Sequence, residues 1–130
     1  MEFAVVAPVA FLVLFGCIEM GRALFVWNSV DEVTRYGARL AVVTDPSTPD
    51  VVRNAMVSHG AGLNFTTPST QISITYYQSD GTTTTTSKTD AAFATVSVSG
   101  LTHTWLIPYV GRTFTIPAFS TTLPAESVGN

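Results

Sequence analysis

FAVVAPVAFLVLFGCI, residues 3–18, is a run of sixteen residues without a charge, and it decides the fold of this chain. Glu2 stands before the run, and Glu19 and Arg22 stand after it. The apolar periodicity then continues to Val43, where the sequence TDP interrupts it. We therefore predict one long helix that ends at Val43 and is apolar all round at first and amphipathic later.

The length of this run makes it a marginal membrane span. A bilayer core about 30 Å thick needs about 20 apolar residues in a helix, whereas sixteen residues cover only about 24 Å. A longer span would include Glu19 and Arg22, and charges inside a membrane are costly. These two residues lie three positions apart, so they can pair on one helix face. The segment is therefore also suited to packing against other protein.

Pro8 is compatible with both environments. A proline inside a helix removes one hydrogen bond, and membrane helices tolerate this where neighbours satisfy the freed carbonyl. Two interpretations stay open: a plain membrane anchor with a kink, or a helix that lies first in lipid and later in a protein bundle. A secretory signal peptide is disfavoured because Glu2, and no positive charge, precedes the run.

The composition excludes several classes of protein. Of the 130 residues 46% are hydrophobic and 12% are charged, against about 25% charged in ordinary soluble domains. The net charge of −3 provides no basic surface for nucleic acid. Cys17 is the single cysteine, so no intramolecular disulfide and no cysteine-based metal site can form. Without a GxSxG, HExxH or phosphate-loop motif, we predict no enzyme, no catalytic residue and no cofactor.

The second half of the helix carries an apolar seam with alternating steps of four and three residues. Such a seam packs against another element, and we predict that it packs on the globular part of this chain. The residues of the seam are Val26, Val30, Val33, Gly37 and Leu40. Asp31, Glu32 and Arg35 form a polar face beside it.

A second, short helix is predicted over residues 49–58. Ser47 or Thr48 can cap it, with Pro49 at its first position. His59 follows, and we expect it to interact with the C-terminal end of this helix rather than to act in catalysis.

The remainder alternates as strands do, over residues 72–77, 94–99 and 113–116, and we interpret residues 101–110 as a connection broken at Pro108. Three to five antiparallel strands with one apolar face would need a cover, which the amphipathic half of the long helix can supply. The predicted fold class is α+β. Residues 1–44 form a membrane or filament-core helix, and residues 45–130 form a β-rich head.

A tract of threonines lies between two of the predicted strands. As a group of exposed hydroxyls it is a possible site of surface modification by O-glycosylation, although a solvated loop or edge strand explains it equally simply. Its members are Thr82, Thr83, Thr84, Thr85 and Thr86.

The N-terminal third resembles the TadE-like family of tight-adherence (Tad/Flp, type IV pilus-like) pilus proteins. The matching features are Glu2-Phe3-Ala4, Pro8, Gly16, Glu19-Met20-Gly21-Arg22 and Arg35-Tyr36-Gly37-Ala38-Arg39. The resemblance implies a type IV pilin-like protein that the inner membrane holds before assembly. A prepilin peptidase and the pilus assembly machinery would then process it into an extracellular filament that serves adhesion and surface colonisation.

The partners that the resemblance implies are identical or related pilin subunits in a homopolymer, and Glu2 would pair with a neighbour's terminal amine. The residues expected in the assembled helix core are Glu2, Phe3, Pro8, Phe11, Phe15, Gly16, Glu19 and Arg22. The alternative is an inner-membrane-anchored binding module, or a minor pseudopilin of the assembly machine, whose head recognises a partner.

Overall fold

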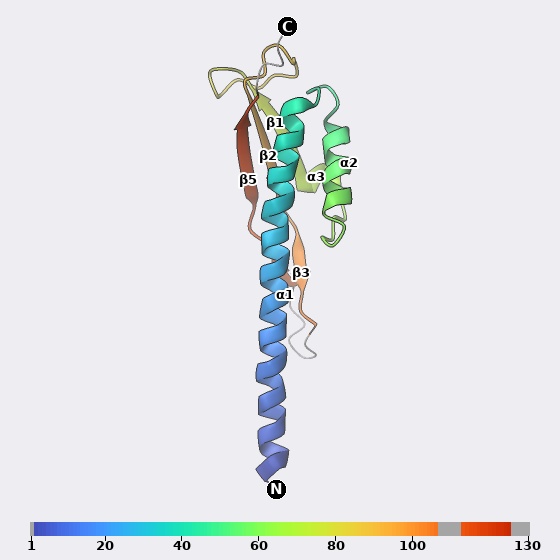
Figure 1. The fold of residues 1–130 in the computed structure, drawn as a ribbon, viewed down its shortest axis with the longest axis vertical. Coiled ribbons are helices and arrows are strands. Elements are labelled where there is room, and N and C mark those ends of the chain that lie inside the picture. Colours follow the sequence, from blue (N-terminus) through green and yellow to red (C-terminus); the bar gives the residue numbers. More distant parts are fainter. Residues whose placement is uncertain (1, 107–112, 126–130) are drawn as a thin grey trace.

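A single helix, α1 (Glu2–Val43), runs the length of the molecule and carries a small head on its C-terminal half (Figure 1). The computed structural model describes residues 2–106 and 113–125. The helix contains 42 residues, which correspond to about 63 Å at 1.5 Å per residue. It is continuous through Pro8. The prediction of one long helix ending at Val43 is therefore confirmed.

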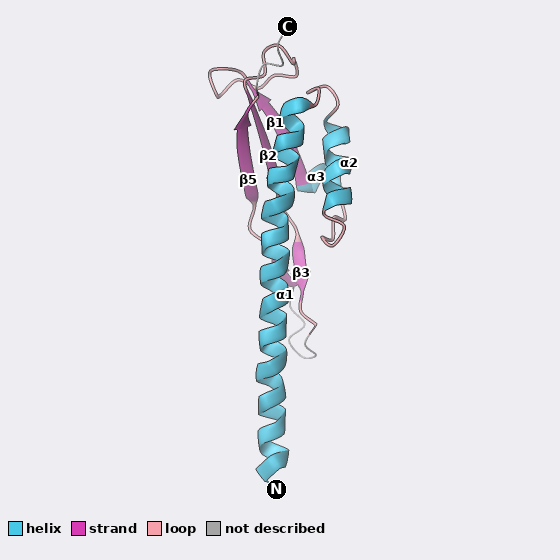
Figure 2. Cartoon of the chain, viewed as in Figure 1, coloured by secondary structure: helices cyan, strands magenta, loops and turns pink. Residues whose placement is uncertain are grey.

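The head combines two short helices with five strands (Figure 2). Three strands form an antiparallel sheet in the order β1-β2-β5, and the other two form a separate antiparallel pair, β3-β4. The elements are α2 (Pro49–His59), α3 (Pro68–Gln71), β1 (Ile72–Tyr77), β2 (Phe93–Val98), β3 (Thr102–Thr104), β4 (Thr113–Thr115) and β5 (Phe119–Pro124).

The predicted α+β class is confirmed, and one detail of the prediction is wrong. Residues 101–110 were expected to form only a connection, but Thr102–Thr104 form β3 and pair with Thr113–Thr115. Three alternating residues are too few to produce a readable pattern, so pairing with a distant segment decides this strand. Pro108 lies outside the described residues.

One face of the three-stranded sheet packs against the C-terminal half of α1. Side chains alternate between the two faces of a strand, and the buried set of β2 is Ala94, Val96 and Val98. On the helix, Val30 and Val33 are buried in the same core. Tyr76 of β1 adds a polar tie, because its hydroxyl donates to the carbonyl of Ala41 over 3.3 Å.

The second helix, α2, lies beside the same half of α1 (Figure 1). Its Val52 and Met56 are fully buried. The expected cap is absent: Thr48 occupies the N-cap position without a side-chain hydrogen bond. Ser47 instead donates from its backbone and its hydroxyl to the carboxylate of Asp45, at 2.9 and 2.7 Å. The turn before α2 is therefore held by the Asp45 side chain.

Gly37 of α1 lies directly against Met56 of α2. A Cβ atom at this position would overlap the Sδ, Cε and Cγ atoms of Met56. Met56 is fully buried, so its side chain has little room to move aside. Gly37 can therefore occupy its predicted position in the seam because it has no side chain that would collide with Met56.

We predict that Gly37→Leu destabilises the head by about 1–3 kcal/mol through overpacking. Gly21→Leu is the control, because a Cβ there meets nothing within 4 Å and the change improves helix propensity by up to about 1 kcal/mol. The measurement is thermal unfolding of the full chain in detergent, followed by circular dichroism. Equal melting temperatures for the two variants would contradict the packing at Gly37.

Candidate functional site

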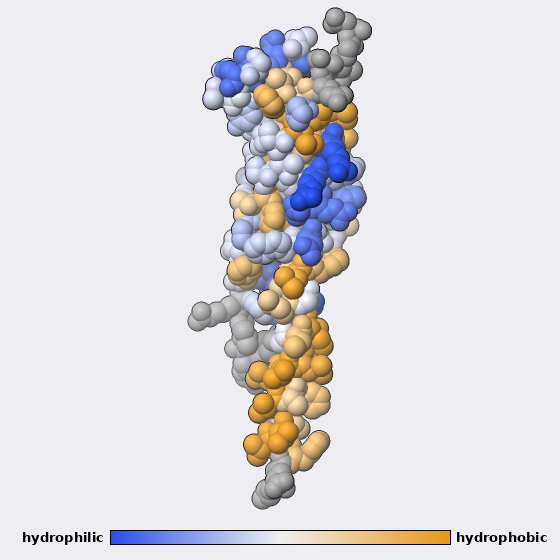
Figure 3. Space-filling view, turned by 60° about the vertical axis from the view of Figure 1, so that its left-hand side comes forward, coloured by the Kyte–Doolittle hydropathy of each residue, from blue (hydrophilic) through white to orange (hydrophobic). Residues whose placement is uncertain are grey.

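The N-terminal half of α1 is apolar, and the described part of the chain leaves most of it uncovered (Figure 3). Phe3 is 83% exposed, Phe11 57% and Phe15 52%. Only 6% of the most apolar 18-residue window is buried, and this helix is long and apolar enough to cross a membrane. Continuous exposed apolar surface of this kind marks a site of contact with lipid or protein.

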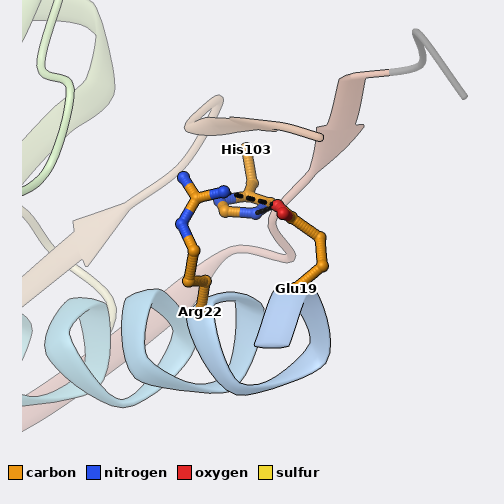
Figure 4. A network of polar contacts seen from close by, with 3 residues as sticks. All are labelled: Glu19, Arg22 and His103. Carbon is orange, nitrogen blue, oxygen red and sulfur yellow. Dashed lines mark hydrogen bonds and ion pairs between the residues drawn. The ribbon is translucent and has the colours of Figure 1, made fainter. Parts of the chain in front are cut away.

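A cluster of three polar side chains stands where the uncovered part of α1 meets the head (Figure 4). Arg22 donates to Oε1 of Glu19 at 2.6 Å, and Nε2 of His103 lies 3.2 Å from the same oxygen. Glu19 and His103 are buried, with 3% and 6% exposure, whereas the Arg22 side chain is 43% exposed. The Glu19 carboxylate is therefore buried between two donors, of which Arg22 is partly exposed to solvent.

This cluster ties the β3-β4 pair to the helix. His103 lies in β3, and its Nε2 reaches the Glu19 carboxylate on α1. The ring of Trp105 meets the His103 ring edge-on at 6.2 Å. A buried carboxylate is tolerated only when donors satisfy it, so the cluster holds this part of the head in one place on α1.

The spacing of Glu19 and Arg22 in the sequence predicted their pairing, but nothing in the sequence predicted the third member of the cluster, His103. Two residues three positions apart on a helix can be predicted to be neighbours. His103, by contrast, is separated from Glu19 by 84 positions. A histidine inside a short strand among threonines carries no local sign of this contact.

The remaining predicted positions divide between the two halves of α1. Val30, Val33 and Gly37 are buried in the head, and Val26 and Leu40 are half-buried at its margin. Most positions expected in an assembled helix core lie along the uncovered half, where the rings of Phe11 and Phe15 stack at 6.3 Å. Glu19 is the exception, because it is buried against His103 of its own chain. Glu2 begins α1, but its side chain lies outside the described part of the chain.

His59 takes part in a contact between helices. Its ring stacks on Tyr36 of α1 with centroids 4.3 Å apart, and its Nε2 lies 3.6 Å from a carboxylate oxygen of Glu32. It was expected to act at the end of its own helix. Because α2 lies alongside α1, side chains of α1 are its direct neighbours.

The threonine tract forms an ordered loop after β1. Thr82, Thr83, Thr84 and Thr86 are exposed, and Thr85 is half-buried. The carboxylate of Asp80 accepts the backbone N–H groups of Thr82 and Thr83 and the hydroxyl of Thr83. These bonds hold the pKa of Asp80 well below its usual range, the Thr83 hydroxyl contributing most.

We predict that this loop keeps its structure in mild acid. A carboxylate whose pKa is lowered in the folded state stabilises that state above its unfolded pKa, and the contribution is lost as pH falls through the lowered value. The NMR signals of the Thr82 and Thr83 amides should therefore stay native at a pH that protonates ordinary aspartates. In Asp80→Asn they should be displaced at every pH. Titration of Asp80 with an ordinary value would contradict the turn geometry.

Residues 1–39 match the family model described as TadE-like protein. The match covers about a third of the chain and lies entirely within Met1 and α1, so the resemblance seen in the sequence is confirmed there. No curated protein and no solved structure matches the chain. The family match and the apolar helix indicate a protein of the cell envelope that is associated with the tight-adherence pilus.

We predict strong energetic coupling between Glu19 and His103. A double-mutant cycle with Glu19→Gln and His103→Ala should give a coupling several times larger than that of Asp31 and Arg35, because hydrogen bonds are stronger where water is excluded. The Asp31–Arg35 pair is a suitable control, since it spans 3.0 Å but is solvent-exposed and should contribute about 0.5 kcal/mol or less. Unfolding of the full chain in detergent measures both cycles, and equal couplings would mean that water reaches Glu19.

Proposed function

We propose that this protein is a pilin-like structural subunit that assembles through α1 into an extracellular filament of the tight-adherence, type IV-like pilus. Its roles would be adhesion and surface colonisation. The observation that carries this proposal is the uncovered apolar half of a continuous helix. The described head covers only the C-terminal half of α1, so another molecule has to cover the rest.

The uncovered half of α1 requires lipid or protein as its cover. Moving one large apolar side chain from water into an apolar environment stabilises by about 1.5–3 kcal/mol, so the uncovered half cannot remain in water. Lipid satisfies this requirement before assembly. Apolar side chains gain little by exchanging lipid for protein, and transfer into a bundle therefore depends on close packing between helices.

The cluster around Glu19 makes α1 compatible with both environments, the lipid bilayer and a bundle of helices. Arg22 compensates the Glu19 charge within the same chain, and His103 satisfies the same carboxylate oxygen. An unpaired carboxylate would resist both lipid and a dry helix bundle. With its charge compensated internally, α1 can enter a bundle without requiring a basic residue from its neighbour at this position.

Electron microscopy of sheared extracellular material tests the proposal against the membrane-anchored alternative. Periodic filaments that contain this chain are the expected result. If the chain stays wholly in the membrane fraction and no filament contains it, the protein is instead an anchored module whose head binds a partner.

We predict that Glu2→Ala and Glu2→Gln both lower filament number sharply, while membrane insertion and head folding are unchanged. A carboxylate at a helix N-terminus is favoured by the helix dipole, and it can neutralise a neighbour's terminal amine that would otherwise be buried unpaired. Filament counts per cell, beside an immunoblot of the membrane fraction, measure the effect. Wild-type numbers from Glu2→Gln would remove the electrostatic role, because this change keeps the size and deletes the charge.

A further inference from the structure

An open groove of about 480 Å³ lies on α1 just below the head. One wall is a stripe of α1, and the other is Gly62 in the loop after α2. The stripe consists of Ile18, Gly21, Arg22, Phe25 and Val26. These residues follow one another at the spacing of a single helix face, which in an amphipathic helix is the face that packs against a partner.

The groove continues the face by which α1 packs on its own head. Val26 is both the last residue of the stripe and the first of the seam, and Val30, one turn further, is 1% exposed. Within the groove Ile18 is 53% exposed and Phe25 is 68% exposed. The same helix face is therefore covered above Val30 and left open below it.

Two glycines make the groove hollow. Among the described residues, a Cβ atom built on Gly21 or on Gly62 meets no atom within 4 Å, so both positions have room for a side chain there. Small residues on a helix surface allow a second helix to approach the backbone closely. The single charge in the groove, Arg22, is already paired with Glu19 at 2.6 Å, so the groove does not require an acidic ligand.

We propose that this groove receives the charge-free segment Phe3–Ile18 of a second copy of this chain. The inference rests on the proposed function and specifies where the neighbouring subunit docks. The segment is complementary to the groove because it is uncharged and exposed along its length. The incoming helix would contact the head through Gly62 as well as α1.

The two surfaces lie on different parts of one chain and share only Ile18. This has a consequence for the assembly. Contact between unlike patches is heterologous, so it propagates from copy to copy into an open array unless a rotation closes it. The middle of the docking segment lies 11 to 12 positions before the middle of the stripe. If the helices are parallel, contacting subunits are displaced by about 17 Å along the helix axis.

Filling the groove tests the proposal in the cell. Gly21→Leu and Gly62→Leu should each lower filament number about tenfold or more, equivalent to a loss of about 1.4 kcal/mol in association. Neither should lower the melting temperature in detergent, because neither side chain meets a neighbour within the described chain. Asn54→Leu is the control, since it adds the same apolar side chain at an exposed position of α2 away from the groove. Wild-type filament numbers from both glycine variants would overturn the groove.

Cysteine cross-linking separates this proposal from the proposed function. Gly62→Cys and Ala10→Cys, combined in a Cys17→Ser background, should form disulfide-linked oligomers in membrane vesicles, and Asn54→Cys with Ala10→Cys should not. Filaments without this cross-link would overturn the groove and leave the filament function standing. The cross-link without filaments would support the groove and overturn the filament function, and absence of both would overturn both.

Discussion

The head of this protein is too small to cover its helix. α1 has 42 residues, and the buried core of the head meets it between Val30 and Ala41. Below that core the helix is covered only in part, chiefly by the strand segment that reaches Glu19. The fold of the head, the requirement for lipid or a partner and the groove below the head all follow from this mismatch in length.

The polar cluster stands at the boundary that the mismatch creates. Above it, side chains of the head pack on one face of α1 from Val26 to Ala41, and below it the apolar side chains of α1 are exposed. Glu19 is buried at this boundary because His103 and Arg22 supply donors from two elements. Without them, a carboxylate would be left buried and uncompensated at this position. The cluster thus allows an acidic residue to lie within an otherwise apolar surface.

Short-range patterns in the sequence predicted most of the fold. The charge-free run, the seam at steps of four and three and the alternation in β1 and β2 each reflect which side of an element avoids water. They predicted the long helix, the face that packs and the antiparallel sheet. They failed at β3, because three residues cannot display a period, and at Thr48, because the nearby Asp45 satisfied the turn instead.

The amino-acid sequence by itself determined that one end of the chain is a helix without charge and that the other end is a β-rich head. Local periodicity and the cost of exposing apolar surface to water are sufficient for that conclusion. Only the tertiary structure decided that His103 meets Glu19, that Met56 fills the space beside Gly37 and that Gly62 faces the stripe of α1. These contacts join residues far apart in the chain, and their energies depend on packing that no local pattern records.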